Sequence, residues 1–427
     1  MTTVQHHTHS PPPTRLPFSV VDEITRHCLD PSEPETVHIE VHLPAPPHPA
    51  RLRAAFLEAF GRHPRILMRE APRPWYRRRY EWELTPHPDT DHVVTFHEPG
   101  PDALARARQR ALAQAPPLSL SPPIRVEAIG NVLVLTVNHT ALDGPACLRI
   151  LATAAELYGG RDNSPAAAGA PARPESHPQL QPPSVGVAPV ARVAHGTPGA
   201  PGNGMLVADL PVPRRPPSAP YTVNDQLMVA TARMIAEWNH ERGAPPRPLR
   251  ITMPVDDRPR GLDMPIGNGT RLVEVPFREE ELREETGELL RRTADRTRAL
   301  KSLPRPQLGH GAALLTAPVV PVTVRAALTR QLRRAVAPWT STTLLSNIGR
   351  VPYPLDFGEG VGRATAVWFS APARMPRGLT VTTASTNGRL HLALRWSGVL
   401  LGPQDGDHLR ELFEKHLNST AEEGSSP

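Results

Sequence analysis

Residues 139–144 read His-Thr-Ala-Leu-Asp-Gly, and their types and spacing could support acid–base chemistry. An imidazole takes up and returns a proton near neutral pH, so His139 could deprotonate a hydroxyl or amine as it attacks a carbonyl. Asp143 could orient the imidazole directly, or it could pair with an arginine and keep the turn rigid. Gly144 suits a tight turn and a close backbone approach. The alternative is a loop histidine of no catalytic role followed by Asp143 as a helix N-cap, a position that aspartate favours.

The segments on either side of this motif would fix its position. Residues 132–137, Val-Leu-Val-Leu-Thr-Val, are apolar and largely β-branched, which is typical of a buried strand. Residues 144–158 have the composition of a helix. The sequence therefore predicts that His139 lies on a tight turn at the end of a buried strand, with its ring free to project into a cleft.

The motif resembles the His-His-x-x-x-Asp-Gly signature of the condensation-domain and chloramphenicol-acetyltransferase-like acyltransferases. This superfamily includes peptide-synthetase condensation domains, polyketide-associated acyltransferases, wax ester synthases and, more remotely, plant acyltransferases. Here Asn138 replaces the first histidine, and His139 matches the second, which is the family's catalytic base. The plant branch also keeps only the second histidine, so the replacement does not by itself imply a loss of activity.

Other segments resemble the family in the expected order, from about residue 16 to about residue 412. Each is weakly specific alone, and their order carries the argument. They are the first helix with the segment after it (51–67), a Thr-Val-Asn-Asp helix start (222–227), a Pro-Val-Asp-Asp-Arg-Pro segment with a later Gly-Asn (253–259 and 267–268), Ser-Asn-x-Gly (346–349) and a late strand pair (378–390).

The resemblance implies a role for each matching residue. His139 is expected to be the general base, and Asp143, beside Gly144, to be a structural aspartate that pairs with Arg258. The resemblance places Ser346 and Asn347, and also Asn138, at the tunnel or at the developing oxyanion. Ser-Asn-x-Gly is also ordinary turn chemistry.

The resemblance also implies the fold, a mixed α/β architecture of two-layer sandwiches. Two chloramphenicol-acetyltransferase-like subdomains would form a V around a central tunnel. The composition of the chain predicts the following division: a disordered tail (1–14), an N-terminal subdomain with His139 (15–160), a linker and crossover rich in Pro, Ala and Gly (161–220), a C-terminal subdomain (221–418) and a second disordered tail (419–427).

Local patterns predict the main elements of these subdomains. Strands are expected at 37–43, 125–129, 205–212, 249–254, 364–369, 379–383 and 390–396, and helices at 54–60, 224–239, 278–302, 323–335 and 403–417.

Charge and composition exclude several classes of function. The formal net charge is +6, and arginine supplies nearly all of the basic residues, since Lys301 and Lys415 are the only lysines. The arginines do not form basic stripes with interleaved aromatic residues, apart from residues 75–80, Trp-Tyr-Arg-Arg-Arg-Tyr. Nucleic acid is therefore not an expected partner, and that run is interpreted as a solvated edge strand. A contact with the phosphates of coenzyme A or phosphopantetheine remains open for it.

The remaining features predict a cytoplasmic enzyme without a metal or bound cofactor. Two cysteines, Cys28 and Cys147, are too few for a disulfide scaffold or a zinc cluster. No segment approaches the roughly 20 apolar residues of a membrane span, and residues 1–13 do not resemble a signal peptide. A Gly-x-Ser-x-Gly elbow, a Walker loop and a His-Glu-x-x-His motif are absent from the sequence.

Three functional hypotheses follow. The first is an acyltransferase of specialised metabolism that moves an acyl group from acyl-coenzyme A or an acyl carrier protein to a hydroxyl of a small molecule or lipid. The second is a free-standing condensation enzyme that forms an amide with a carrier-bound substrate. The third is a repurposed member of the family that does not transfer acyl groups, in which substitution of His139 would leave function intact.

Overall fold

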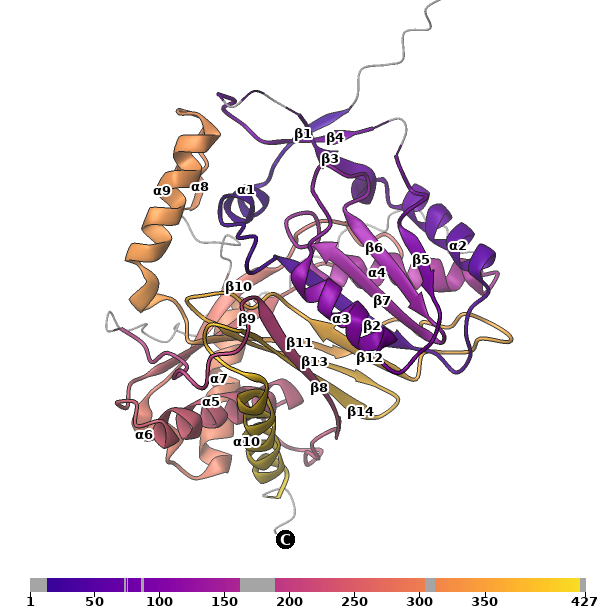
Figure 1. Cartoon of the computed structure of the whole chain (residues 1–427). Helices are drawn as coiled ribbons and strands as arrows, with labels where there is room; N and C mark the ends of the chain where they lie inside the picture. Colours follow the sequence, from indigo (N-terminus) through magenta and orange to yellow (C-terminus); the bar gives the residue numbers. More distant parts are fainter. Residues whose placement is uncertain are drawn as a thin grey trace, which may run out of the picture.

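The structure is a computed structural model that describes residues 14–72, 74, 76–85, 88–161, 189–303 and 312–422. The predicted N-terminal tail lies almost wholly outside the described residues, as do most of the predicted linker and the last residues of the predicted C-terminal tail. Within the described residues the chain builds two large sheets with helices packed on them (Figure 1).

The first large sheet carries the motif. Its strand order is β12-β2-β7-β6-β5, and the central strand β7 packs against apolar residues on both faces. Alternate residues of β7 explain this, because Leu133, Leu135 and Val137 join the main core while Val132 and Val134 face a smaller cluster beneath α3. Helices α2 and α4 cover one face and α3 the other. The bounds are β2 (Thr36–His42), α2 (Pro49–Arg62), β5 (Val94–His97), α3 (Ala103–Ala113), β6 (Ile124–Ile129), β7 (Val132–Asn138) and α4 (Gly144–Tyr158).

The second large sheet has the order β10-β9-β11-β13-β14-β8 and supports helices α5, α7 and α10 (Figure 1). Its core gathers alternate residues of β13 and β14 against α5 and α10. The bounds are β8 (Asn203–Pro211), α5 (Val223–Glu241), β9 (Leu249–Val255), β10 (Arg271–Phe277), α6 (Glu279–Leu282), α7 (Thr286–Ser302), β11 (Thr343–Arg350), β13 (Leu379–Thr386), β14 (Arg389–Ser397) and α10 (Pro403–Glu422).

A third, small sheet of order β1-β4-β3 belongs to the first half, together with helix α1 and the 3-10 helix η1. Helix α9 lies at the edge of the molecule beside α1, so that a segment of the second half packs on the first (Figure 1). The bounds are β1 (Arg15–Pro17), α1 (Val20–His27), η1 (Pro64–Leu67), β3 (Met68–Glu70), β4 (Glu81–Leu84), α8 (Ala312–Leu315), α9 (Val322–Ala335), η2 (Ala337–Trp339) and β12 (Ala366–Ser370).

Two strands cross the boundaries drawn from composition. β12, from within residues 221–418, pairs antiparallel with β2 and completes the first large sheet. β8, from within the predicted linker, pairs along its whole length with β14 and forms an edge of the second sheet. The second half therefore contributes a strand to the first sheet, and the predicted linker contributes an edge strand to the second. The predicted mixed α/β fold with two sheet-based halves is confirmed.

Three local predictions were wrong. The helix expected at 278–302 is two helices: the first ends at Leu282, and Glu285 caps the second by accepting hydrogen bonds from Gly287 N (2.9 Å) and Glu288 N (3.0 Å). Residues 76–80 form a turn and a bend instead of an edge strand. The last helix continues to Glu422, so residues 419–422 of the predicted tail are helical.

Candidate active site

The turn that carries the motif is tied to the neighbouring strand. β7 ends at Asn138, and the backbone N–H of His139 donates to Glu35 O at 2.8 Å. The buried side chain of Asn138 donates to Pro116 O (3.0 Å) and accepts from Thr140 N (3.0 Å). Asn138 therefore holds the turn in place, and it is not among the residues that line the cavity described below.

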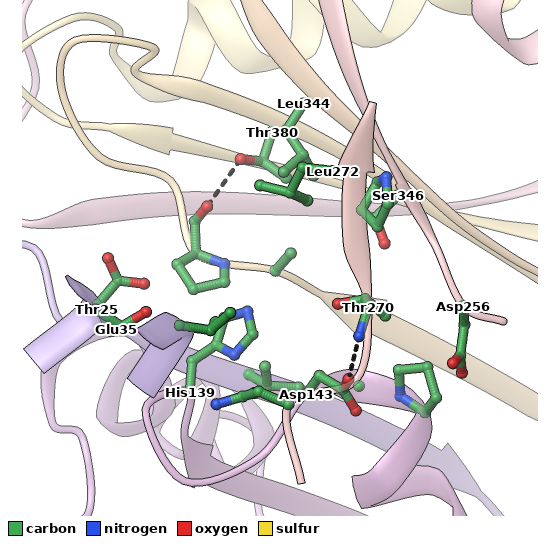
Figure 2. A pocket seen from close by; sticks show the side chains of 18 of the residues that line it. Thr25, Glu35, His139, Asp143, Asp256, Thr270, Leu272, Leu344, Ser346 and Thr380 are labelled. Carbon is green, nitrogen blue, oxygen red and sulfur yellow. Dashed lines mark hydrogen bonds between the residues drawn. The ribbon is translucent and has the colours of Figure 1, made fainter. Parts of the chain in front are cut away.

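The imidazole of His139 is oriented by its own turn. Its Nδ1 lies 3.1 Å from Leu142 O, and a carbonyl oxygen only accepts hydrogen bonds. This contact assigns the proton to Nδ1 and leaves the lone pair on Nε2. Figure 2 shows the ring of His139 projecting into the cavity. The geometry thus provides an acceptor nitrogen in a fixed direction at the end of a rigid strand.

Asp143 serves the backbone and an arginine, and it does not touch the imidazole. Its Oδ1 accepts from Ala146 N at 3.1 Å as the N-cap of α4, and its Oδ2 accepts from Gly269 N (2.8 Å) and Thr270 N (3.2 Å) (Figure 2). Arg258 Nη2 donates to the same Oδ2 at 2.7 Å, which is the expected ion pair. Of the two arrangements considered for Asp143, the structure shows the pairing with an arginine, together with the helix N-cap.

Arg258 makes the largest number of hydrogen bonds around Asp143. Its Nε donates to Asp256 Oδ1 at 2.8 Å, and its Nη1 donates to the carbonyls of Pro265 (3.1 Å) and Gly267 (3.0 Å). Burial alone would lower the pKa of Arg258, but the hydrogen bonds and charges of Asp256 and Asp143 outweigh it and raise the pKa. The guanidinium thus joins the motif turn of the first half to the loop between β9 and β10 in the second.

Gly144 is required by a close contact. A Cβ atom built at this position would lie 2.1 Å from Cζ of Phe369 on β12. The start of α4 can therefore approach the crossing strand only if residue 144 has no side chain.

A cavity of about 350 Å³ lies between the two halves and contains the motif. His139, Asp143 and Gly144 line it from the first half, and Ser346 and Asn347 line it from β11. Arg258 stands behind this lining. Among the described residues, no group of three or more His, Cys, Asp or Glu side chains is placed to hold a metal ion. Cys147 is fully buried, and burial raises the pKa of its thiol well above the usual value.

A bulge in β11 explains why consecutive residues face this cavity. Successive strand residues normally point to opposite faces, yet Ser346, Asn347 and Ile348 all line the cavity. The pairing with β13 shifts between Asn347 and Gly349, and Asn347 Oδ1 accepts from Gly349 N at 2.8 Å. The side chain of Asn347 also accepts from Thr383 Oγ1 (3.1 Å) and donates to Asn224 Oδ1 (3.3 Å), so its hydrogen-bonding atoms already have partners. The hydroxyl of Ser346 has no hydrogen-bond partner among the described residues and is available to a ligand.

Sequence reasoning missed the charged residues at one end of the cavity. Glu35, Arg333, Arg374 and Arg377 line it together, although they come from distant parts of the chain. Glu35 precedes a predicted strand and Arg374 follows another, and nothing in their spacing indicates that they would form an ion pair. They become neighbours because β12 adds to the sheet beside β2.

Comparisons with known proteins agree with this architecture. No model of a protein family matches the chain. An uncharacterized protein of Mycobacterium tuberculosis (strain H37Rv) is 28% identical over 407 residues, which is 86% of this chain and 91% of that protein. The described helices of this chain include none long and apolar enough to cross a membrane.

Solved structures resemble the chain over almost its whole length. The trichothecene 15-O-acetyltransferase TRI3 of Fusarium sporotrichioides has a TM-score of 0.64 at 13% identity and covers 96% of this chain and 95% of its own. The wax ester synthase/diacylglycerol acyltransferase of Marinobacter aquaeolei VT8 has a TM-score of 0.60 at 15% identity. The match covers 96% of this chain and 100% of that one. The first condensation domain of the CDA synthetase has a TM-score of 0.61 at 16% identity, and the match covers 97% of each chain. The chain therefore has the fold of the condensation-domain and chloramphenicol-acetyltransferase-like acyltransferases, as the sequence predicted.

Proposed function

We propose that this protein is an acyltransferase that moves an acyl group from a thioester, on coenzyme A or on an acyl carrier protein, to a hydroxyl of a small molecule or lipid. One observation carries the proposal. His139 presents an unprotonated Nε2 to a cavity between the two halves, and its Nδ1 is held by Leu142 O at 3.1 Å. The fold places the chain among acyltransferase-like proteins, which supports this chemistry over hydrolysis at a catalytic triad.

In the proposed mechanism, both substrates meet in the cavity and no covalent enzyme intermediate forms. Nε2 of His139 accepts the proton of the acceptor hydroxyl as its oxygen attacks the thioester carbonyl. The tetrahedral intermediate collapses, the carbon–sulfur bond breaks, and the thiolate takes the proton back from the imidazolium. The products are an ester and a free thiol, and much of the rate comes from holding the two substrates together.

The other site residues have supporting roles in this proposal. Asp143 and Arg258 fix the turn that carries the base, and Gly144 allows that turn to lie against Phe369. The free hydroxyl of Ser346 lines the cavity and is suited to donate a hydrogen bond to the oxyanion. Asn138 supports catalysis indirectly, because its hydrogen bonds to Pro116 O and Thr140 N hold the turn that carries His139. The protein would act in the cytoplasm, as part of specialised metabolism.

The direct test offers the protein a panel of short and long acyl-coenzyme A donors, each with pooled alcohols or pooled amines. Free thiol is measured with a chromogenic disulfide, and products are identified by mass spectrometry. Ester formation in step with thiol release is the expected result. Amide products would favour the condensation reaction. If no acyl group were transferred from any coenzyme A or carrier-bound donor, the proposal would be contradicted. The third hypothesis, a repurposed member of the family that does not transfer acyl groups, would then be favoured.

A further inference from the structure

One end of the cavity is strongly cationic. Arg333 from α9, and Arg374 and Arg377 from the loop between β12 and β13, line it together, and these residues are called the arginine cluster below. Glu35 is the one carboxylate that lines the cavity beside them, and it forms an ion pair with Arg374. The other two carboxylates of the lining, Asp143 and Asp256, are held by Arg258.

Two members of the cluster lack an ion-pair partner among the described residues. Arg377 donates from Nε to Ser341 Oγ at 2.7 Å, and Arg333 donates from Nη2 to Met375 O at 2.6 Å. The pKa of Arg377 is lowered to about 10, chiefly by burial; Arg374 and Arg333 contribute to this lowering, and Glu274 and Glu35 oppose it. Because Arg377 and Arg333 make no ion pair, this end of the cavity carries unneutralised positive charge in partly buried surroundings, where an anion gains most from pairing.

The arginine cluster begins next to the proposed base. Glu35 accepts the backbone N–H of His139 at its carbonyl, and its carboxylate holds Arg374. Figure 2 shows Glu35 and His139 as neighbours at the cavity. The base and the cluster are therefore joined through a single residue. A phosphopantetheine arm keeps its phosphate far from its thioester, so a group bound at the cluster while chemistry occurs at His139 fits a small acceptor better than the donor.

We propose, building on the proposed function, that the acceptor is a hydroxycarboxylic acid. Its carboxylate binds the arginine cluster, through Arg333 and Arg377 above all, and its hydroxyl lies at Nε2 of His139. The cluster would then determine which hydroxyl is acylated, because a neutral alcohol leaves two guanidinium groups without a counter-ion.

The test separates binding from catalysis by using the His139→Ala protein. Calorimetry measures its affinity for a series of hydroxycarboxylic acids of increasing length and for the methyl ester of each. At least one acid is expected to bind ten-fold or more tightly than its ester, with the difference shrinking at high salt. If no acid binds more tightly than its ester, the inference is overturned.

Variants of the cluster give the second arm. Arg377→Gln and Arg333→Gln are expected to weaken binding of the preferred acid about ten-fold or more and to leave its ester unchanged. Arg377→Lys, which keeps the charge, should retain much of the preference. Arg330→Gln is the matched control, because Arg330 lies on the same helix as Arg333, is exposed and contacts His27 O instead of the cavity. Equal losses in the Arg330 and Arg333 variants would contradict the assignment.

Kinetics with active protein distinguish the two substrates. Arg377→Gln should raise KM for the hydroxy acid and leave KM for the acyl-coenzyme A unchanged. A rise in KM for the donor alone would assign the cluster to the donor's phosphates and overturn the acceptor assignment. Selective binding of an acid without any acyl transfer would instead contradict the proposed function and leave the anion site standing.

Discussion

At the scale of single residues, the hydrogen bonds of Asp143 agree with the structural position that the motif resemblance implies. Its two oxygens receive hydrogen bonds from three backbone N–H groups and from Arg258, and none from His139. The aspartate thus holds the turn in position, while the contact with Leu142 O orients the imidazole.

The pair of Asp143 and Arg258 can be tested with a double-mutant cycle. Asp143→Asn and Arg258→Gln should each lower the free energy of unfolding by about 3 kcal/mol, because each leaves a charged partner in a largely buried place. The double variant should be less destabilised than the sum of the two, by about 1 kcal/mol or more. Urea denaturation measures all four proteins.

Activity gives the same pair a second readout. Since Asp143 does not touch the imidazole, Asp143→Asn should lower kcat while the acid limb of the pH–rate profile stays in place. A shift of that limb by a pH unit or more would show that Asp143 acts on the base directly, and additive losses in the cycle would show that the ion pair is unimportant.

At the scale of elements, the strand and helix beside the motif were predictable and β11 was not. The apolar run at 132–137 and the helix at 144–158 have clear periodicity, and the structure has β7 at Val132–Asn138 and α4 at Gly144–Tyr158. The sequence of β11 is Thr-Leu-Leu-Ser-Asn-Ile-Gly-Arg, and its Ser-Asn-x-Gly segment has a composition typical of a turn. Its strand conformation comes from pairing with β9 and β13, which a local pattern cannot show.

The bulge in β11 should depend on Gly349. Its φ of 72° is a left-handed conformation, and a Cβ there would meet no atom within 4 Å, so the cost of a side chain is purely conformational. Gly349→Ala should therefore lower the free energy of unfolding by about 1 kcal/mol and reduce thiol release more than five-fold, because Ser346 and Asn347 are re-aimed.

Asparagine provides the matched control at this position, since it tolerates the left-handed region better than alanine. Gly349→Asn should retain more stability and activity than Gly349→Ala, as measured by thermal unfolding and by thiol release. Equal behaviour of the two variants, or full activity in both, would rule out a role for the bulge in aiming the site.

At the scale of the whole molecule, the pairing of a strand of the second half with the first sheet could not be predicted from the sequence. β12 lies among residues that otherwise build the second sheet, and nothing in Ala-Val-Trp-Phe-Ser indicates that it pairs with β2. The pairing of β12 with β2 also brings two residues of the arginine cluster, Arg374 and Arg377, to the cavity beside Glu35. Long-range pairing determines these contacts, whereas composition and periodicity are local.

Buried histidines should make the folded protein sensitive to acid. Burial, with help from nearby arginines, lowers the pKa of His27, His38 and His63 from 6.5 to about 4. Below pH 6.5 the unfolded chain therefore binds more protons at these sites, so stability is lost as pH falls from 6.5 towards 4. Each histidine should cost about 2 kcal/mol between pH 7 and pH 5. Burial raises the pKa of Glu23 to about 7, so this carboxyl stabilises the fold as the pH falls. Its effect is opposite in sign to that of the three histidines and comes from a single group.

Urea denaturation at pH 7 and pH 5 measures this loss. His38→Leu should reduce the difference between the two pH values by about 2 kcal/mol, since the ring nitrogens of His38 have no hydrogen bond among the described residues. His48→Gln, at an exposed histidine, is the matched control and should leave the difference unchanged. An unaltered pH dependence in His38→Leu would show that His38 is not held neutral by burial.

The central claim is that Nε2 of His139 is the base for acyl transfer from a thioester, and the rate of His139→Ala tests it most directly. Thiol release coupled to ester formation should fall at least about 100-fold in this variant, with the melting temperature unchanged within a few degrees. His63→Gln supplies a control at another histidine near α4, where the ring meets Thr153 Oγ1 at 2.7 Å outside the cavity, and it should keep most of the activity. Equal rates in wild type and His139→Ala, with the ester still formed, would contradict the assignment of the base.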